Sequence, residues 1–99
     1  MIRHIVSWNL KEAASTTEKR ENAEKMKRDL ESLHEIVPGI IAIEVILDVL
    51  PTSNHDVVLY SLFESVETLA AYQIHPEHVR VSNWASSVVE NRICVDFEV

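Results

Sequence analysis

Residues 72–79 of the chain read Tyr-Gln-Ile-His-Pro-Glu-His-Val. Proline disfavours the helical conformation in the residue before it and fits best at the first position of a helix. The stretch therefore predicts that one helix runs through Tyr72 and ends near Ile74, and that a second helix begins at Pro76. His75 then lies at the junction.

The same break brings two titratable side chains together. On one continuous helix Tyr72 and His78 would point in different directions, because they are six residues apart. A bend at Pro76 lets both side chains face one pocket, where a phenol and an imidazole can exchange protons with a ligand. The alternative is structural: the stretch is only a helix break whose aromatic ring fills the core.

Outside this stretch, strand and helix patterns alternate along the chain. Period-two patterns predict strands, and apolar residues three or four positions apart predict helices. Ser15 and Ser65 are the expected N-caps of two helices. The predicted strands are 1–10, 40–50, 56–63 and 92–99, and the predicted helices are 16–37, 66–74 and 76–89, the last from the apolar stripe Val79, Val81, Trp84, Val88 and Val89.

This order is β-α-β-β-α-β with the second helical unit broken in two. It predicts the ferredoxin-like fold of the α+β class, in which one face of a four-stranded antiparallel sheet carries both helical units. The 99 residues form one domain, 1–99, because the chain contains neither an internal repeat nor a long linker.

The other face of such a sheet has no helices on it. The strands carry apolar side chains in both directions, as in the neighbouring pairs Ile5–Val6, Val57–Val58 and Leu62–Phe63. The open face is therefore too apolar to remain in water. We expect two copies to pack through it as a symmetric homodimer, a dimeric α+β barrel, with residues 40–50 lending an edge to the partner.

Charge and composition exclude several classes of protein. The net charge of −7 opposes binding to nucleic acids or anionic membranes. No apolar run is long enough to span a bilayer, and the first residues lack the pattern of a signal peptide, so a cytoplasmic protein is expected. The single cysteine, Cys94, excludes an internal disulfide and is expected to be a small core residue, with a catalytic thiol as the weaker alternative.

Four segments together resemble the stress-responsive dimeric α/β-barrel (Dabb) family: His4-Ile5-Val6, Phe63-Glu64-Ser65-Val66-Glu67, Tyr72-x-x-His75-Pro76-x-His78-Val79, and Val95-Asp96-Phe97. The resemblance spans the whole chain and implies the dimeric barrel. The family includes plant stress proteins and a plant polyketide cyclase that closes an aromatic ring without cofactor or metal. By this resemblance Tyr72 and His78 correspond to the catalytic pair of the cyclase, and His4 to a histidine of its pocket.

Two other pocket residues of the cyclase have no counterpart here. A histidine on its third strand falls on Val57, and the tyrosine of its first helix is missing from the region Met26–Leu30. The resemblance therefore keeps only the central pair, Tyr72 and His78, and it implies neither one activity nor the substrate of the cyclase.

The first functional hypothesis is a cofactor-independent lyase or cyclase that acts on a β-keto or polyketide-like small molecule. His78 would take a proton from the carbon beside a carbonyl, and the Tyr72 hydroxyl would bind the carbonyl oxygen. His4, His75 and Trp84 are the expected substrate-binding residues, and His4 is a candidate for holding His78 in one tautomer.

Two alternatives belong to other classes. In the second hypothesis the protein is a non-catalytic dimer that binds a small molecule, and Tyr72 and His78 are hydrogen-bonded to each other or to the backbone. A cavity of roughly 300 Å³ or more beside His78 would favour a bound ligand. A metal site built from His55, His75, Glu77 and His78 is the third and weakest hypothesis, because the sequence fixes no third ligand.

Overall fold

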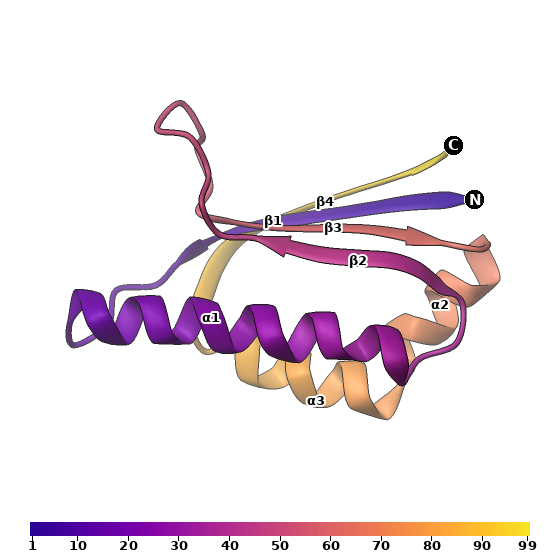
Figure 1. Ribbon diagram of the computed structural model, residues 1–99, viewed down its shortest axis with the longest axis horizontal. Coiled ribbons are helices and arrows are strands. Elements are labelled where there is room, and N and C mark those ends of the chain that lie inside the picture. The colour runs from indigo at the N-terminus through magenta and orange to yellow at the C-terminus, as the bar shows by residue number, and fades with distance from the viewer.

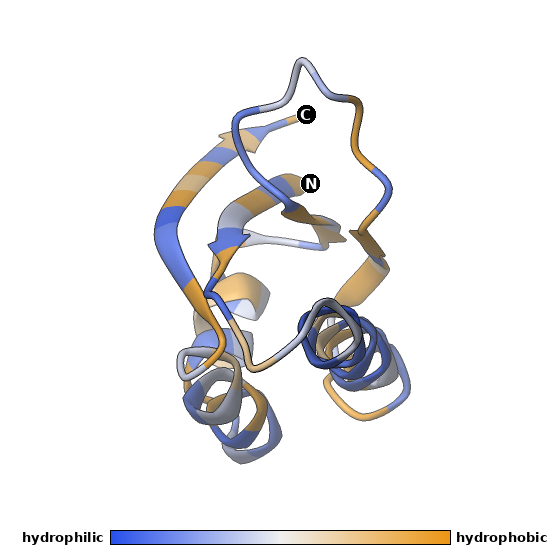
Figure 2. Cartoon of the chain, turned by 90° about the vertical axis from the view of Figure 1, so that its left-hand side faces the viewer, coloured by the Kyte–Doolittle hydropathy of each residue, from blue (hydrophilic) through white to orange (hydrophobic).

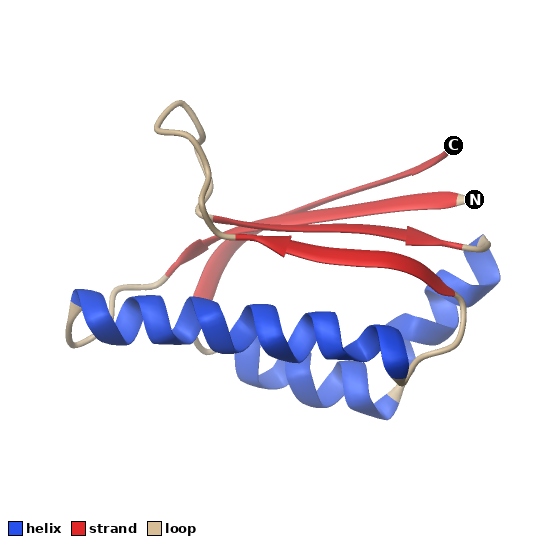
Figure 3. Ribbon diagram, in the orientation of Figure 1, coloured by secondary structure: helices blue, strands red, loops and turns tan.

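The computed structural model describes all 99 residues, Met1–Val99, and contains one antiparallel sheet with its helices on one face (Figures 1 and 3). The strands lie in the order β2-β3-β1-β4. This is the predicted ferredoxin-like α+β fold. In chain order the elements are β1 (Ile2–Leu10), α1 (Thr16–Ser32), the 3-10 turn η1 (Leu33–Glu35), β2 (Ile40–Ile46), β3 (Val57–Phe63), α2 (Val66–Ile74), α3 (Pro76–Ala85) and β4 (Val89–Glu98).

The helix break at Pro76 is confirmed. Helix α2 ends at Ile74, and His75 has extended backbone angles, φ −63° and ψ 133°, before α3 begins at Pro76. The His75 side chain caps α3, because its Nδ1 accepts a hydrogen bond from the Glu77 backbone N–H at 3.1 Å. At the start of α2, Ser65 forms the predicted cap as part of a capping box.

The third helix is shorter than predicted. It ends at Ala85, so Val88 lies in a turn and Val89 is the first residue of β4. Of the predicted apolar stripe, Val79 is exposed, whereas Val81 is buried. The apolar spacing predicted a helix that was too long, because Val88 in the turn and Val89 at the start of the strand continue the apolar pattern of the helix.

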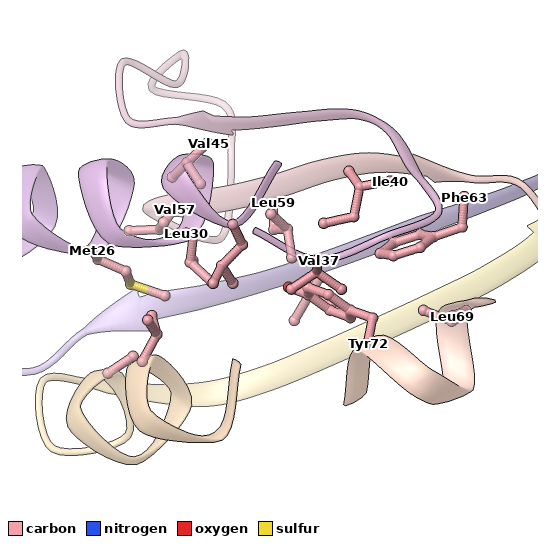
Figure 4. Packing of buried hydrophobic residues seen from close by; sticks show 14 of the residues in the cluster. Met26, Leu30, Val37, Ile40, Val45, Val57, Leu59, Phe63, Leu69 and Tyr72 are labelled. Carbon is pink, nitrogen blue, oxygen red and sulfur yellow. The ribbon is translucent and has the colours of Figure 1, made fainter. Parts of the chain in front are cut away.

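The core lies between the sheet and the helices (Figure 4). Helix α1 contributes the predicted Ala23, Met26 and Leu30. From α2 the Tyr72 ring reaches inward and packs against Phe63 of β3, with ring centroids 4.8 Å apart. Tyr72 is the largest fully buried side chain of the protein.

Strand β2 differs from its predicted pattern, which placed Ile41, Ile43 and Val45 on one face. The pairing with β3 shifts between Ile40 and Ala42. The extra residue, Ile41, is 43% exposed, while Ile43 and Val45 pack on the core. A bulge of this kind inverts the alternation on one side of itself, which a strict two-residue period cannot anticipate.

Strand β4 contains a second bulge, and this one determines both faces of the strand. Asn9 of β1 pairs with Glu90 and Ser7 pairs with Ile93, so two β4 residues, Asn91 and Arg92, lie opposite one β1 residue. Asn91 has φ 57°, a left-handed conformation that asparagine tolerates better than most residues. Before the bulge the odd-numbered Val89 faces the helices. Because the bulge adds one residue, the even-numbered residues after it face the helices and the odd-numbered residues face away.

Cys94 is not the core residue that was predicted, because it is exposed. Every residue of β4 after Val89 is exposed, since β4 is an edge strand and the helices do not extend over its outer part.

The segment 47–56, between β2 and β3, rises from the sheet on the side away from the helices (Figures 1 and 2). It replaces the last four residues of the strand predicted over 40–50. Leu50 at its outer part is 71% exposed. No helix of the chain has the length and apolar character to cross a bilayer.

Replacing Gly39 with alanine is expected to destabilise the protein by about 2–4 kcal/mol. Gly39 has φ +90°, and an added Cβ would lie 2.5 Å from Cβ of Thr68, a member of the capping box of α2. Urea unfolding measures the loss. Glu21→Ala on the exposed side of α1 is the control, expected within about 0.5 kcal/mol of the parent. Equal stability of both variants would contradict the close contact.

Candidate functional site

A cavity of about 210 Å³ lies between the sheet and helices α1, α2 and α3. This is below the roughly 300 Å³ that the sequence analysis set as favouring a ligand. It is larger than a 150 Å³ apolar cavity that holds benzene, so a small molecule fits. The lining residues are His4, Val6, Trp8, Met26, Leu30, Leu59, Tyr72, His78, Ser82, Ala85, Ser86, Val89, Glu90, Asn91 and Arg92.

Tyr72 enters the cavity wall from the last turn of α2. Its side chain is fully buried, and its hydroxyl is the one buried side-chain polar atom of the chain without a hydrogen-bond partner. Burial raises the pKa of Tyr72 well above its ordinary value of 10, so the phenol remains protonated. A buried hydroxyl without a partner costs about 1–3 kcal/mol, and a ligand oxygen in the cavity would satisfy it.

His78 lies beside Tyr72 in the first part of α3, and the two ring centroids are 4.3 Å apart. Its Nδ1 is 3.1 Å from the backbone carbonyl of Gln73. Because a carbonyl only accepts, Nδ1 carries the proton and Nε2 has a free lone pair. Burial lowers the pKa of His78 below 6.5, so the imidazole is neutral at pH 7.

This contact corrects two expectations. The tautomer of His78 is held by Gln73 and not by His4. The non-catalytic alternative expects Tyr72 and His78 to be hydrogen-bonded to each other or to the backbone, and this holds for His78 Nδ1 alone.

His4 reaches the cavity from β1 and is nearly fully buried. Its Nδ1 lies 2.5 Å from Oδ1 of Asp96, which pairs with it across β1 and β4. The carboxylate accepts, so Nδ1 again carries the proton and Nε2 is free. The ring centroids of His4 and Tyr72 are 6.3 Å apart. The cavity thus contains two imidazoles with free Nε2 atoms and one phenol.

Two predicted substrate-binding residues lie elsewhere. His75 is the cap of α3, and Trp84 packs on the outside of the core with the Lys25 ammonium 4.4 Å from its ring centroid. Neither side chain lines the cavity. No role for Asp96 or Arg92 follows from the sequence pattern alone. A register that placed His4 opposite Asp96 would have identified the first of them, but the bulge in β4 conceals that register.

The four candidate metal ligands of the sequence analysis do not gather. His55 contacts Ser7 on the open face at 2.6 Å, while His75 caps α3. The group that does gather is His4, Cys94 and Asp96, whose ligand atoms lie within 4.8 Å of one another. Burial and the Asp96 carboxylate raise the pKa of the Cys94 thiol. The thiol is therefore protonated at pH 7 and is not an activated nucleophile.

Comparison with known families identifies the chain. The model of the stress-responsive A/B barrel (Dabb) domain matches residues 2–99. The chain belongs to the Dabb family. A comparison with curated protein sequences finds no match.

Several solved structures are similar to this chain. A dimeric protein of unknown function from Bacteroides fragilis, with a ferredoxin-like fold, is 32% identical with a TM-score of 0.89, covering 99% of this chain and 95% of that one. A Dabb family protein from Mesorhizobium loti is 23% identical with a TM-score of 0.76, covering 99% and 95%. The hydroxynitrile lyase of Passiflora edulis is 18% identical with a TM-score of 0.81, covering 97% and 90%, which shows a shared fold alone.

Proposed function

We propose that this Dabb protein is a cofactor-independent lyase or cyclase that removes a proton beside a carbonyl group of a small β-keto or polyketide-like molecule. One observation carries the proposal: the buried Tyr72 hydroxyl has no partner and lies in a cavity wall beside His78, whose Nε2 is free. A donor held without a partner is suited to bind an oxygen that gains charge during a reaction.

In the proposed reaction His78 Nε2 takes the proton from carbon, and the electron pair of the C–H bond moves toward the carbonyl oxygen. The Tyr72 hydroxyl donates to that oxygen as it becomes an enolate. His4, held by Asp96, is the second imidazole within reach of the substrate. In a cyclase the enolate carbon then attacks a second carbonyl of the same molecule, and the oxygen of that carbonyl takes the proton from His78 Nε2. In a lyase the reverse step applies: His78 Nε2 takes the proton of a β-hydroxyl group, the carbon–carbon bond breaks, and its electron pair forms the enolate that Tyr72 binds.

The resemblance to the plant polyketide cyclase, olivetolic acid cyclase, supports this chemistry through Tyr72, His78 and His4. A neighbour that shares the fold is named a hydroxynitrile lyase, so a fold of this shape is compatible with lyase chemistry in another protein. Exchange of α-protons in D2O, followed by proton NMR over a panel of β-keto acids, esters and thioesters, tests the first step. Exchange no faster than in buffer across the panel would overturn the proposal.

The exchange rate is expected to fall in acid with a midpoint below pH 6.5. His78 must be neutral to act as a base, and burial lowers its pKa below the ordinary value of 6.5. On the alkaline side the rate is expected to hold beyond pH 9, because burial raises the pKa of Tyr72. A pH series from 4.5 to 9.5 measures both limbs. An acid midpoint above 6.5 would assign the proton transfer to another group.

We also propose that two copies associate through the open face of the sheet. On this face Val95 is 51% exposed and Phe97 is 46% exposed, and Ile93 and Tyr60 are also exposed. The segment 47–56 projects on the same side, where it can flank a second copy. The Bacteroides fragilis relative is described as dimeric, which supports the same arrangement here.

The second candidate function is a non-catalytic dimer that binds a small molecule. The hydrogen bond of His78 Nδ1 to the backbone carbonyl of Gln73, a contact that this alternative expects, favours it. Native mass spectrometry of the purified protein distinguishes the two candidates: a co-purified ligand that shows no proton exchange supports binding alone.

A further inference from the structure

Arg92 is a cation at the cavity wall that the fold leaves without a carboxylate. It lines the cavity, and none of the ion pairs of the chain includes it. Arg3, Lys11 and Arg28 also lack an ion pair, but none of them lines the cavity. Arg20 and Arg80, by contrast, each contact a neighbouring carboxylate.

The bulge in β4 is what brings Arg92 to the cavity. Asn91 takes its left-handed conformation directly before Arg92 and donates from Nδ2 to Oδ1 of Asn9 at 3.1 Å. Without the extra residue, Arg92 would share the face of Glu90 and Ile93 would turn toward the helices. Bulges commonly redirect a side chain beside a functional site. The bulge thus places Arg92 in the wall of the cavity that Tyr72 and His78 also line.

The remaining lining restricts the ligand. Most of the inner wall is apolar, with residues such as Val6, Leu30 and Leu59. The polar side chains of the lining are Tyr72, His4 and His78, together with Ser82, Ser86, Glu90, Asn91 and Arg92. A guanidinium binds a planar carboxylate through two parallel hydrogen bonds. A fitting ligand therefore has a carboxylate at one end, a carbonyl a few atoms away, and a short apolar body.

We propose that Arg92 is the anion-recognition residue of this cavity and that the substrate is a small 3-oxo carboxylate, bound with its carboxylate on Arg92 and its 3-oxo oxygen at Tyr72. The substrate class rests on the proposed function, whereas the anion site does not. In the reaction the proton moves from C2 to His78 Nε2, and the electron pair of the C–H bond moves to the 3-oxo oxygen. Arg92 neutralises the carboxylate, which would otherwise oppose the second negative charge of the enolate.

Two features of the cavity wall weaken the binding of an anion at Arg92, and they determine the choice of control variant. Glu90 also lines the cavity, and its carboxylate would repel a bound anion. Arg92 itself is exposed, so water competes for its guanidinium. Glu90→Gln is therefore the matched variant: it removes a charge of opposite sign from the same short stretch of β4.

Calorimetric titration with acetoacetate and with methyl acetoacetate, its neutral ester, tests the proposal on the full chain. Arg92→Gln is expected to weaken acetoacetate binding by about 10- to 100-fold and to change binding of the ester by less than about twofold. Arg92→Lys is expected to recover only part of the lost affinity, because lysine restores the positive charge but cannot form the two parallel hydrogen bonds of a guanidinium. Glu90→Gln is expected to bind acetoacetate equally or more tightly.

Each outcome decides a different statement. Equal binding of acetoacetate by the parent and Arg92→Gln, or equal preference of the parent for acid and ester, would overturn the anion site. Inorganic phosphate that competes with acetoacetate and binds more tightly would overturn the carboxylate assignment. Carboxylate binding that depends on Arg92, without α-proton exchange in any member of the panel of β-keto acids, esters and thioesters, would overturn the proposed function and leave the anion site standing.

Discussion

His78→Ala is expected to reduce the rate of α-proton exchange by about 10²- to 10⁴-fold, the range that a positioned general base contributes. The imidazole is neutral at pH 7 because burial lowers its pKa, and the Gln73 carbonyl fixes the proton on Nδ1. No other side chain of α3 that lines the cavity supplies a base, since Ser82 and Ala85 are the remaining two. Proton NMR in D2O measures the loss.

Tyr72→Phe is expected to lower the same rate by about 10²-fold or more while raising the free energy of unfolding by about 1 kcal/mol. The hydroxyl is buried without a partner, so its removal relieves an unfavourable group and leaves the ring packed on Phe63. Opposite changes in activity and stability are typical of a group retained for function. A stability loss in Tyr72→Phe would indicate that the hydroxyl serves the fold.

His75→Ala is the control for both variants. It removes the other imidazole of the same motif, which caps α3 and does not line the cavity. We expect a stability loss of about 1 kcal/mol and an exchange rate within about twofold of the parent. Parent-like exchange rates in both His78→Ala and Tyr72→Phe would refute the roles proposed for these residues.

Val95→Asp is expected to convert a homodimer into a monomer at micromolar concentration. Val95 pairs with Ile5 of β1 on the open face, and a two-fold interface would contain the new carboxylate twice. Burying such unpaired charges costs several kcal/mol, so the dissociation constant should rise by at least about 100-fold. The chain itself should fold normally, because Val95 is already half exposed in one copy.

Sedimentation velocity distinguishes the two states, since one chain has a mass of 11.3 kDa. Val66→Asp is the matched control: Val66 is 62% exposed but lies at the first position of α2, where a negative charge is favourable. It should remain dimeric. A parent protein that sediments at the mass of one chain would contradict the proposed association.

Much of the candidate site was predictable from eight residues. Pro76 restricts the residue before it and starts a helix, and these are steric effects between neighbours in the chain. The sequence therefore predicted the break that brings Tyr72 and His78 together, which the structure shows as a ring separation of 4.3 Å. His75 was assigned to the pocket by proximity in the sequence, but its role as a cap turns it away.

The sequence by itself determined the order of the elements, the helix break at Pro76 and the alternation of apolar residues at Ile93, Val95 and Phe97. Only the tertiary structure decided which side of the sheet those residues face. The bulge at Asn91 inverts the alternation, so that Arg92 and Asp96 turn toward the helix side of the sheet, whereas Val95 and Phe97 turn toward the open face. His4 and Asp96 are 92 positions apart, and their contact depends on the register of two strands. Register is settled by all the packing across a sheet at once, whereas a cap or a proline acts only on its neighbours in the chain.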